Sequence, residues 1–120
     1  MSKSIFAVFL MVLVTGCSTE IKKNDAGVVI EKKLPPQLWS DHKKLDISTD
    51  ICALKAMSVL SSLGFTGVIQ NGNYAYGNFI NNRAAIKCVE MPAGSFVYFS
   101  VAGQDKEVVE KLRNEISWKF

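Results

Sequence analysis

The sequence predicts a single two-layer α+β domain, in which a four-stranded antiparallel meander carries two helices on one face and holds one disulfide. Three observations lead to this fold. The hydrophobic pattern of residues 45–120 follows the order helix, four strands, helix. Every connection between these strands is too short for the crossover that a parallel sheet requires. Two cysteines, Cys52 and Cys88, lie in this segment, and a chain of 120 residues with 48% apolar content can bury one small core.

The first helix is expected to begin after Ser48 or Thr49, because either side chain can cap its N-terminus. Its apolar residues fall within a narrow arc, and Gly64 is placed to end it. Cys52 lies in that arc and should therefore face the core.

Four strands follow, each separated from the next by a short turn. The first turn contains Asn71-Gly72, a dipeptide that tight hairpins favour because it tolerates positive φ. Further turns are expected at residues 81–82 and 91–94. The strands are expected over residues 65–70, 74–80, 83–89 and 95–102.

The third of these strands alternates, and Ala84, Ile86 and Cys88 share one of its faces. If that face meets the helices, Cys88 can reach Cys52. The last helix is expected after Asp105, a possible N-cap. Its apolar stripe consists of Val109, Leu112, Ile116 and Phe120.

The N-terminus has the features of an export signal. Lys3 precedes the apolar run Ile5–Val14, which is too short to span a bilayer, since a membrane helix needs about 20 residues. The run ends in Thr15 and Gly16, small residues of the kind that a signal peptidase accepts. Residues 1–16 are therefore predicted to be a cleaved signal peptide.

The sequence Val14-Thr15-Gly16-Cys17 resembles the lipobox of bacterial lipoproteins. This resemblance implies that Cys17 is diacylglycerylated and becomes the acylated N-terminus, and several acyl chains on one residue would anchor the protein stably in a membrane. Ser18 then favours the outer membrane by the enterobacterial sorting rule, with the protein facing the periplasm. The alternative is an ordinary signal whose end happens to carry a cysteine.

Residues 17–44 are expected to form the lipidated cysteine and a flexible tether, because they are rich in lysine and contain Pro35-Pro36. Two apolar islands interrupt this segment. Residues 28–30 could add a short strand to the sheet edge, and Trp39 could dock on the domain of residues 45–120.

If Cys17 carries lipid, Cys52 and Cys88 remain as a pair in an exported chain. Cysteine pairs in oxidising compartments usually form disulfides, and the wide spacing is unlike that of a CxxC redox motif. A structural disulfide is therefore predicted, and two buried free thiols are the alternative.

The sheet face away from the helices is expected to carry an aromatic patch with two cations. Such a patch resembles a recognition surface. Two structural alternatives stay open, namely that the register places these rings in the core, or that they only stabilise neighbouring strands. The candidate partner-binding residues are Tyr74, Tyr76, Phe96 and Tyr98, with Arg83 and Lys87 beside them.

No motif for catalysis stands out. His42 lies in the predicted tether with no second histidine or cysteine at ligand spacing, no GxSxG motif occurs, and Gly72 to Gly77 lacks the Lys-Ser/Thr of a phosphate loop. We expect neither a metal, a cofactor nor an enzymatic activity. The net charge of +3 and the predicted export also argue against a nucleic-acid partner.

Two functions fit this pattern. The first is a lipid-anchored interaction module that binds another envelope or secreted protein, similar in size and build to the small envelope lipoproteins that act as accessory, inhibitor or immunity subunits. The second is a binder of small ligands or cell-wall glycans that uses the same aromatic rings.

Overall fold

The structure is a computed structural model that describes residues 33–120, and residues 34–120 form one compact unit. The predicted signal peptide and the lipidation site at Cys17 lie outside the described residues, as does the apolar island at 28–30. The elements are, in chain order, β1 (Gln37–Leu45), α1 (Thr49–Ser62), β2 (Thr66–Asn71), β3 (Tyr74–Phe79), β4 (Asn82–Glu90), β5 (Ser95–Gly103) and α2 (Lys106–Lys119).

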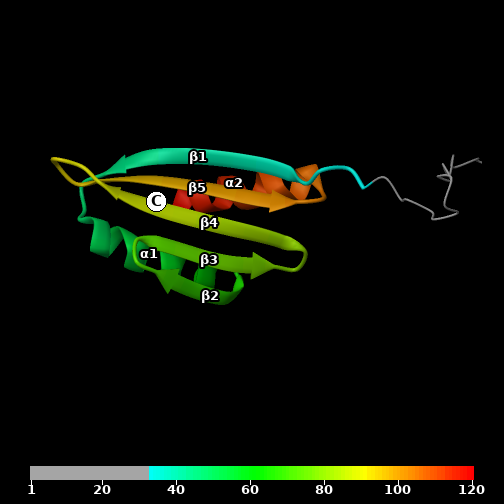
Figure 1. The fold of residues 1–120 in the computed structure, drawn as a ribbon, viewed down its shortest axis with the longest axis horizontal. Coiled ribbons are helices and arrows are strands. Elements are labelled where there is room, and N and C mark those ends of the chain that lie inside the picture. The colour runs from blue at the N-terminus through cyan, green and yellow to red at the C-terminus, as the bar shows by residue number, and fades with distance from the viewer. Residues whose placement is uncertain (1–32) are drawn as a thin grey trace, which may run out of the picture. The chain divides into compact units, whose positions relative to one another are not determined.

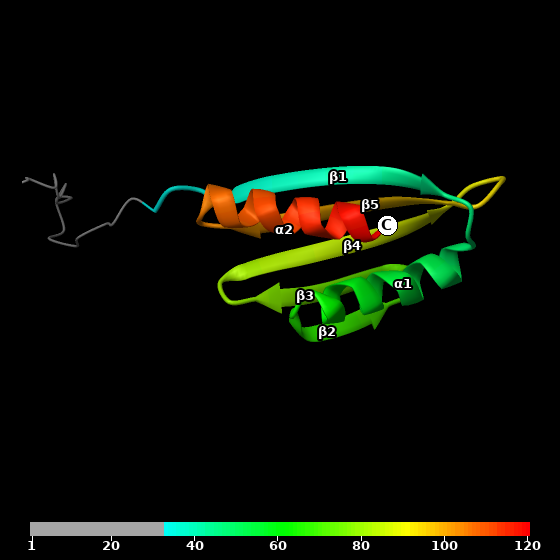
Figure 2. The ribbon, with the colours of Figure 1, turned by 180° about the vertical axis from the view of Figure 1, so that it is seen from behind.

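The protein has an α+β fold with one antiparallel sheet in the strand order β1-β5-β4-β3-β2. The expected meander is confirmed as β2 to β5, and the two expected helices are α1 and α2. Figures 1 and 2 together show that both helices lie on the same side of the sheet. In Figure 2, α2 lies over β1 and β5, and α1 lies on the half of the sheet that contains β2 and β3.

The sheet has five strands, so the predicted count of four is wrong. The additional strand, β1, lies in the part of the sequence that was assigned to the tether, and it pairs with β5 along its whole length. Its helix-facing side chains alternate with exposed ones, but two of the four, Asp41 and Lys43, are charged. The alternation of apolar and polar residues that indicates a strand in a sequence is therefore missing from β1. Trp39, on the same side, packs against the core, so the suggested docking of this residue on the domain is confirmed.

The buried core joins both helices to the central strands. Its largest fully buried side chains include Phe99 of β5, Ile86 of β4, Leu60 of α1 and Ile116 of α2. Phe99 also stacks on Phe120, with the ring centroids 5.9 Å apart. Because β4 and β5 lie in the middle of the sheet, their inward side chains are covered from both halves of the helical layer.

The helix N-termini are capped as the sequence suggests. The Ser48 hydroxyl accepts a hydrogen bond from the Ile51 N–H at 3.4 Å, and the Asp105 carboxylate accepts bonds from the N–H groups of Glu107 and Val108. Each cap satisfies backbone donors that have no partner within the helix.

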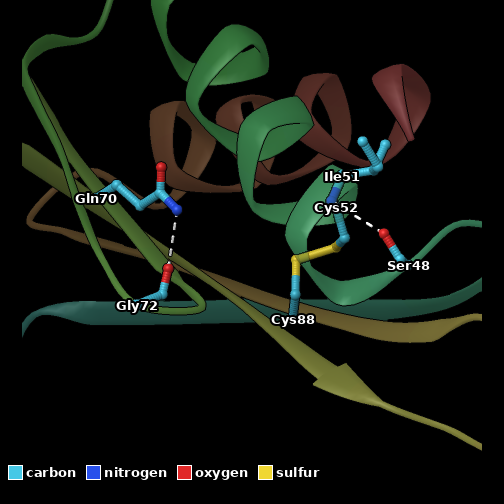
Figure 3. The surroundings of a disulfide bond; sticks show 6 residues. All are labelled: Ser48, Ile51, Cys52, Gln70, Gly72 and Cys88. Atoms are coloured by element: carbon cyan, nitrogen blue, oxygen red, sulfur yellow. Dashed lines mark hydrogen bonds between the residues drawn. A yellow bond between two sulfur atoms is a disulfide. The ribbon is translucent and has the colours of Figure 1, made fainter.

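The predicted disulfide between Cys52 and Cys88 is confirmed (Figure 3). It links α1 to β4, and its Cα atoms are 6.0 Å apart. Both cysteines are buried in the core. The bond therefore fixes α1 against the sheet from within the packed layer.

Removal of this disulfide should lower the stability of the fold strongly. The crosslink closes a sequence separation of 36 residues. In the chain-entropy treatment, a loop of this size contributes about 4 kcal/mol. We expect the Cys52→Ala/Cys88→Ala variant to lose about that much free energy of unfolding, measured by urea denaturation without reductant. Added reductant should destabilise the wild type and leave the variant unchanged. If reductant does not change the unfolding of the wild type at intermediate urea concentrations, the disulfide does not have this stabilising role.

Candidate interaction surface

The face of the sheet opposite the helices is uncovered in the compact unit, and we call it the open face (Figure 1). Its side chains alternate along each strand with those that point into the core. The open face consists of Leu38, Ser40, His42 and Lys44 of β1, Phe96, Tyr98, Ser100 and Ala102 of β5, Arg83, Ala85, Lys87 and Val89 of β4, Tyr74, Tyr76 and Asn78 of β3, and Ile69 and Asn71 of β2.

The structure brings all of the predicted surface residues together on this face. The strand register forms one continuous row in which Tyr98 pairs with Lys87 and Lys87 pairs with Tyr74. Tyr98 is 44% exposed, whereas Tyr74, Tyr76 and Phe96 are half-buried. The alternative register, with these rings in the core, is therefore wrong.

Two tyrosines and two cations are packed against one another at one side of the open face. The rings of Tyr74 and Tyr76 stack with centroids 5.7 Å apart and an interplanar angle of 4°. The Lys87 ammonium lies 4.7 Å from the centroid of the Tyr74 ring, and the Arg83 guanidinium lies 5.9 Å from that of Tyr76. Each such cation–π contact is worth about 0.5–1 kcal/mol at an exposed site. The contacts hold both cations close to the sheet and occupy part of the ring faces.

Strand β1 adds two residues that the sequence analysis did not place on this surface. His42 stacks on Phe96 with ring centroids 5.2 Å apart, and it is the register partner of Tyr98. Lys44 is the register partner of Phe96 and is exposed. Residues 37–45 form an uninterrupted run without glycine or proline directly after Pro35-Pro36, which permits a strand but does not distinguish it from a tether.

The open face carries positive charge and no carboxylate. Asp41 and Glu90 are the two acidic residues within the strands of the described chain. Asp41 contacts α2, and Glu90 lies two residues from the buried Cys88 and so points to the same helix side of the sheet. Lys44, Arg83 and Lys87 therefore have no acidic neighbour within the face.

Contacts with α2 hold β1 in place and thereby position His42 and Lys44. The Trp39 ring lies between two cations of α2, with the Lys106 ammonium 5.6 Å and the Arg113 guanidinium 5.5 Å from its centroid. The Lys43 ammonium donates a hydrogen bond to the Ser117 carbonyl. Polar and aromatic contacts therefore hold β1 against α2, whereas aliphatic side chains hold the central strands against the helices.

Asp41 takes part in the same contact between β1 and α2. Its carboxylate accepts hydrogen bonds from the His42 N–H at 2.8 Å and from the Ser117 hydroxyl at 3.0 Å, and the Arg113 guanidinium lies 3.7 Å away. The His42 backbone bond is the largest influence, and these three groups together hold the pKa of Asp41 below its ordinary value of 3.8, although burial opposes them.

The direction of this pKa shift predicts how Asp41 affects stability. A carboxyl whose pKa is depressed by folding stabilises the folded state above the unfolded pKa, and this stabilisation is lost as the pH falls through the folded pKa. We expect Asp41→Asn to be slightly less stable than the wild type at pH 7, because the ion pair is partly exposed. In urea denaturation the difference should close below the ordinary carboxyl pKa of about 3.8. A difference that stays constant down to acidic pH would show that the charge of Asp41 is unimportant.

The described residues offer no group of three histidine, cysteine or acidic side chains that could hold a metal ion. Neither helix in residues 33–120 combines the length and hydropathy needed to cross a membrane. The chemistry that the open face does provide is aromatic contact area with fixed cations, which suits binding.

Comparison of the sequence with models of protein families found no match. Comparison with curated proteins also found no match.

Proposed function

We propose that this protein is a lipid-anchored, non-catalytic interaction module of the bacterial cell envelope, and that it binds a protein partner through the open face. The observation that carries the proposal is the uncovered side of a five-stranded sheet on which three tyrosines, a phenylalanine and several cations meet. Aromatic and arginine side chains of this kind are enriched where proteins contact one another.

The dimensions of the face support a protein partner. Five strands at the usual spacing, each six to nine residues long, cover a plane of about 600 Å². This approaches the roughly 800 Å² that each partner buries in an interface of standard size. Four apolar or aromatic side chains lie exposed along it, with Leu38 68%, Ile69 56%, Tyr98 44% and Val89 40% accessible. Exposed apolar area of this extent is typical of a contact surface.

The packing of the tyrosines argues against a glycan as the ligand. A sugar ring stacks on a free aromatic face, whereas Tyr74 and Tyr76 already stack on each other and lie beneath Lys87 and Arg83. Tyr98 alone among the three tyrosines makes no such stack or cation–π contact in the described structure. The open face therefore offers a broad surface of aromatic, apolar and charged side chains, and few free rings on which a sugar could stack.

The location in the envelope rests on the lipobox-like sequence that ends in Cys17, and the disulfide supports it. Disulfides form and persist in oxidising compartments such as the periplasm. We propose that acylated Cys17 holds the chain in the outer membrane and that residues 34–120 face the periplasm. An accessory, inhibitor or immunity role suits a small chain that presents one binding face.

Partner capture tests the role of the open face. The tagged full chain is expected to retain a protein from a detergent extract of its native envelope, and Tyr76→Ala/Tyr98→Ala should reduce the recovery about tenfold or more, since buried tyrosines commonly dominate interfaces. Quantitative mass spectrometry of the retained proteins measures this.

A matched control is Trp118→Ala, which removes an exposed aromatic ring from the helical layer instead. It should retain the partner, and urea denaturation should show that both variants are folded. A partner that binds the double variant as well as the wild type would exclude the open face. Saturable, Tyr98-dependent binding to purified cell-wall sacculi, with no protein captured, would favour the glycan alternative.

The anchor is tested separately. Cys17→Ser should abolish metabolic labelling with palmitate and shift the protein from the membrane fraction to the aqueous fraction, because the acylated thiol would be gone. The Cys52→Ala/Cys88→Ala variant provides the control and should still be labelled. Undiminished labelling of Cys17→Ser would refute lipidation at this residue.

A further inference from the structure

The geometry points to an acidic docking surface on the partner: the open face is built to receive a protein surface that carries carboxylates among apolar side chains. This inference deepens the proposed function and rests on it. It depends on how the cations of the open face are arranged and on what surrounds them.

The cations are spread over the face and do not form one cluster. Lys44 on β1 and Lys87 on β4 have β5 between them, which separates their backbones by about 10 Å or more. Arg83 lies four residues from Lys87 along β4, at about 13 Å. A single small anion cannot contact all of these positions, whereas an extended acidic surface can.

The cations of the open face differ from those of the helix side in having no carboxylate beside them. On the helix side, Lys111 lies 3.9 Å from Glu115, and Arg113 lies 3.7 Å from Asp41 as well as over the Trp39 ring. On the open face, Lys87 and Arg83 contact tyrosine rings alone among the described residues. A ring covers one side of a cation without neutralising it, so its other N–H groups are available to a carboxylate.

These cation–π contacts also prepare the cations for binding. Lys87 is half-buried against its ring, so part of its rotamer freedom is already lost before a partner arrives. Preorganised charged groups form interface ion pairs at a smaller entropic cost than freely moving ones. They also favour a partner of opposite charge over other proteins.

The same arrangement disfavours two other occupants. A second copy of this chain would bring Lys44, Arg83 and Lys87 against a face of equal charge, which is repulsive. A membrane surface is met best by flexible lysines and by apolar side chains that insert, commonly from an amphipathic helix. Here the cations lie along a stiff sheet, with two of them held against rings.

The test measures binding of a defined acidic polypeptide. The full chain is held in phosphatidylcholine nanodiscs, and the probe is a random copolymer of glutamate and tyrosine. We expect saturable binding, which Arg83→Glu/Lys87→Glu weakens about tenfold or more and which added salt weakens as well. Lys44 is not one of the cations that lie over Tyr74 and Tyr76. Lys44→Glu therefore tests charge without disturbing these rings, and it should weaken binding severalfold on its own.

The matched control is Lys111→Glu/Lys119→Glu, which changes the net charge equally but on exposed lysines of α2. If it weakens copolymer binding as much as Arg83→Glu/Lys87→Glu does, the effect is one of net charge and the inference is wrong. Binding to phosphatidylglycerol vesicles through Arg83 and Lys87, without copolymer binding, would overturn it in favour of a lipid surface.

The captured envelope partner separates this inference from the proposed function. A partner that is lost with Tyr76→Ala/Tyr98→Ala but retained by Arg83→Glu/Lys87→Glu at all salt concentrations leaves the proposed function standing and refutes an acidic partner. A partner retained by both double variants refutes the proposed function itself. If both double variants lose the partner and binding to the wild type weakens with added salt, the proposed function and the acidic partner are both supported.

Discussion

The pairing of β1 with β5 is the interaction on which the open face depends. It turns β5 from an edge strand into a central one, which closes the hydrogen bonds on both of its sides. It also extends the sheet under α2, where Trp39 and Asp41 complete the contact. Without β1 the open face would lose Lys44, one of its three cations, and the His42 ring that stacks on Phe96. The pairing of this one strand therefore determines part of the chemistry of the surface.

Most of the fold could be predicted because local patterns agree with the tertiary structure. Alternation reveals β4, the Asn71-Gly72 turn reveals the β2–β3 hairpin, and Asp105 marks the start of α2. Strand β1 could not be found in this way. The side-chain partners of Asp41, Ser117 and Arg113, lie on α2, more than 70 residues further along the chain, and no local pattern shows this contact.

The residues of the candidate surface also divide into those that a local pattern reveals and those that it does not. The six residues on β3, β4 and β5 were predictable because one correct alternation, fixed by Cys88, determines which side of every neighbouring strand is open. His42 and Lys44 were not, since their placement depends on β1. Cys88 therefore has two uses in the prediction: it is the partner of Cys52 in the disulfide, and it shows which side of the sheet faces the helices.

The separation of charge between the two faces has a consequence for how the protein meets other molecules. Residues 34–120 contain nine lysines and arginines and eight acidic residues, so this unit is almost neutral. Three of the positive charges, Lys44, Arg83 and Lys87, lie on the open face, which leaves six positive charges against eight negative ones elsewhere. The unit is thus an electric dipole directed through the plane of the sheet. In the field of a charged neighbour such a dipole experiences a torque, and the open face turns toward negative charge before any contact is made.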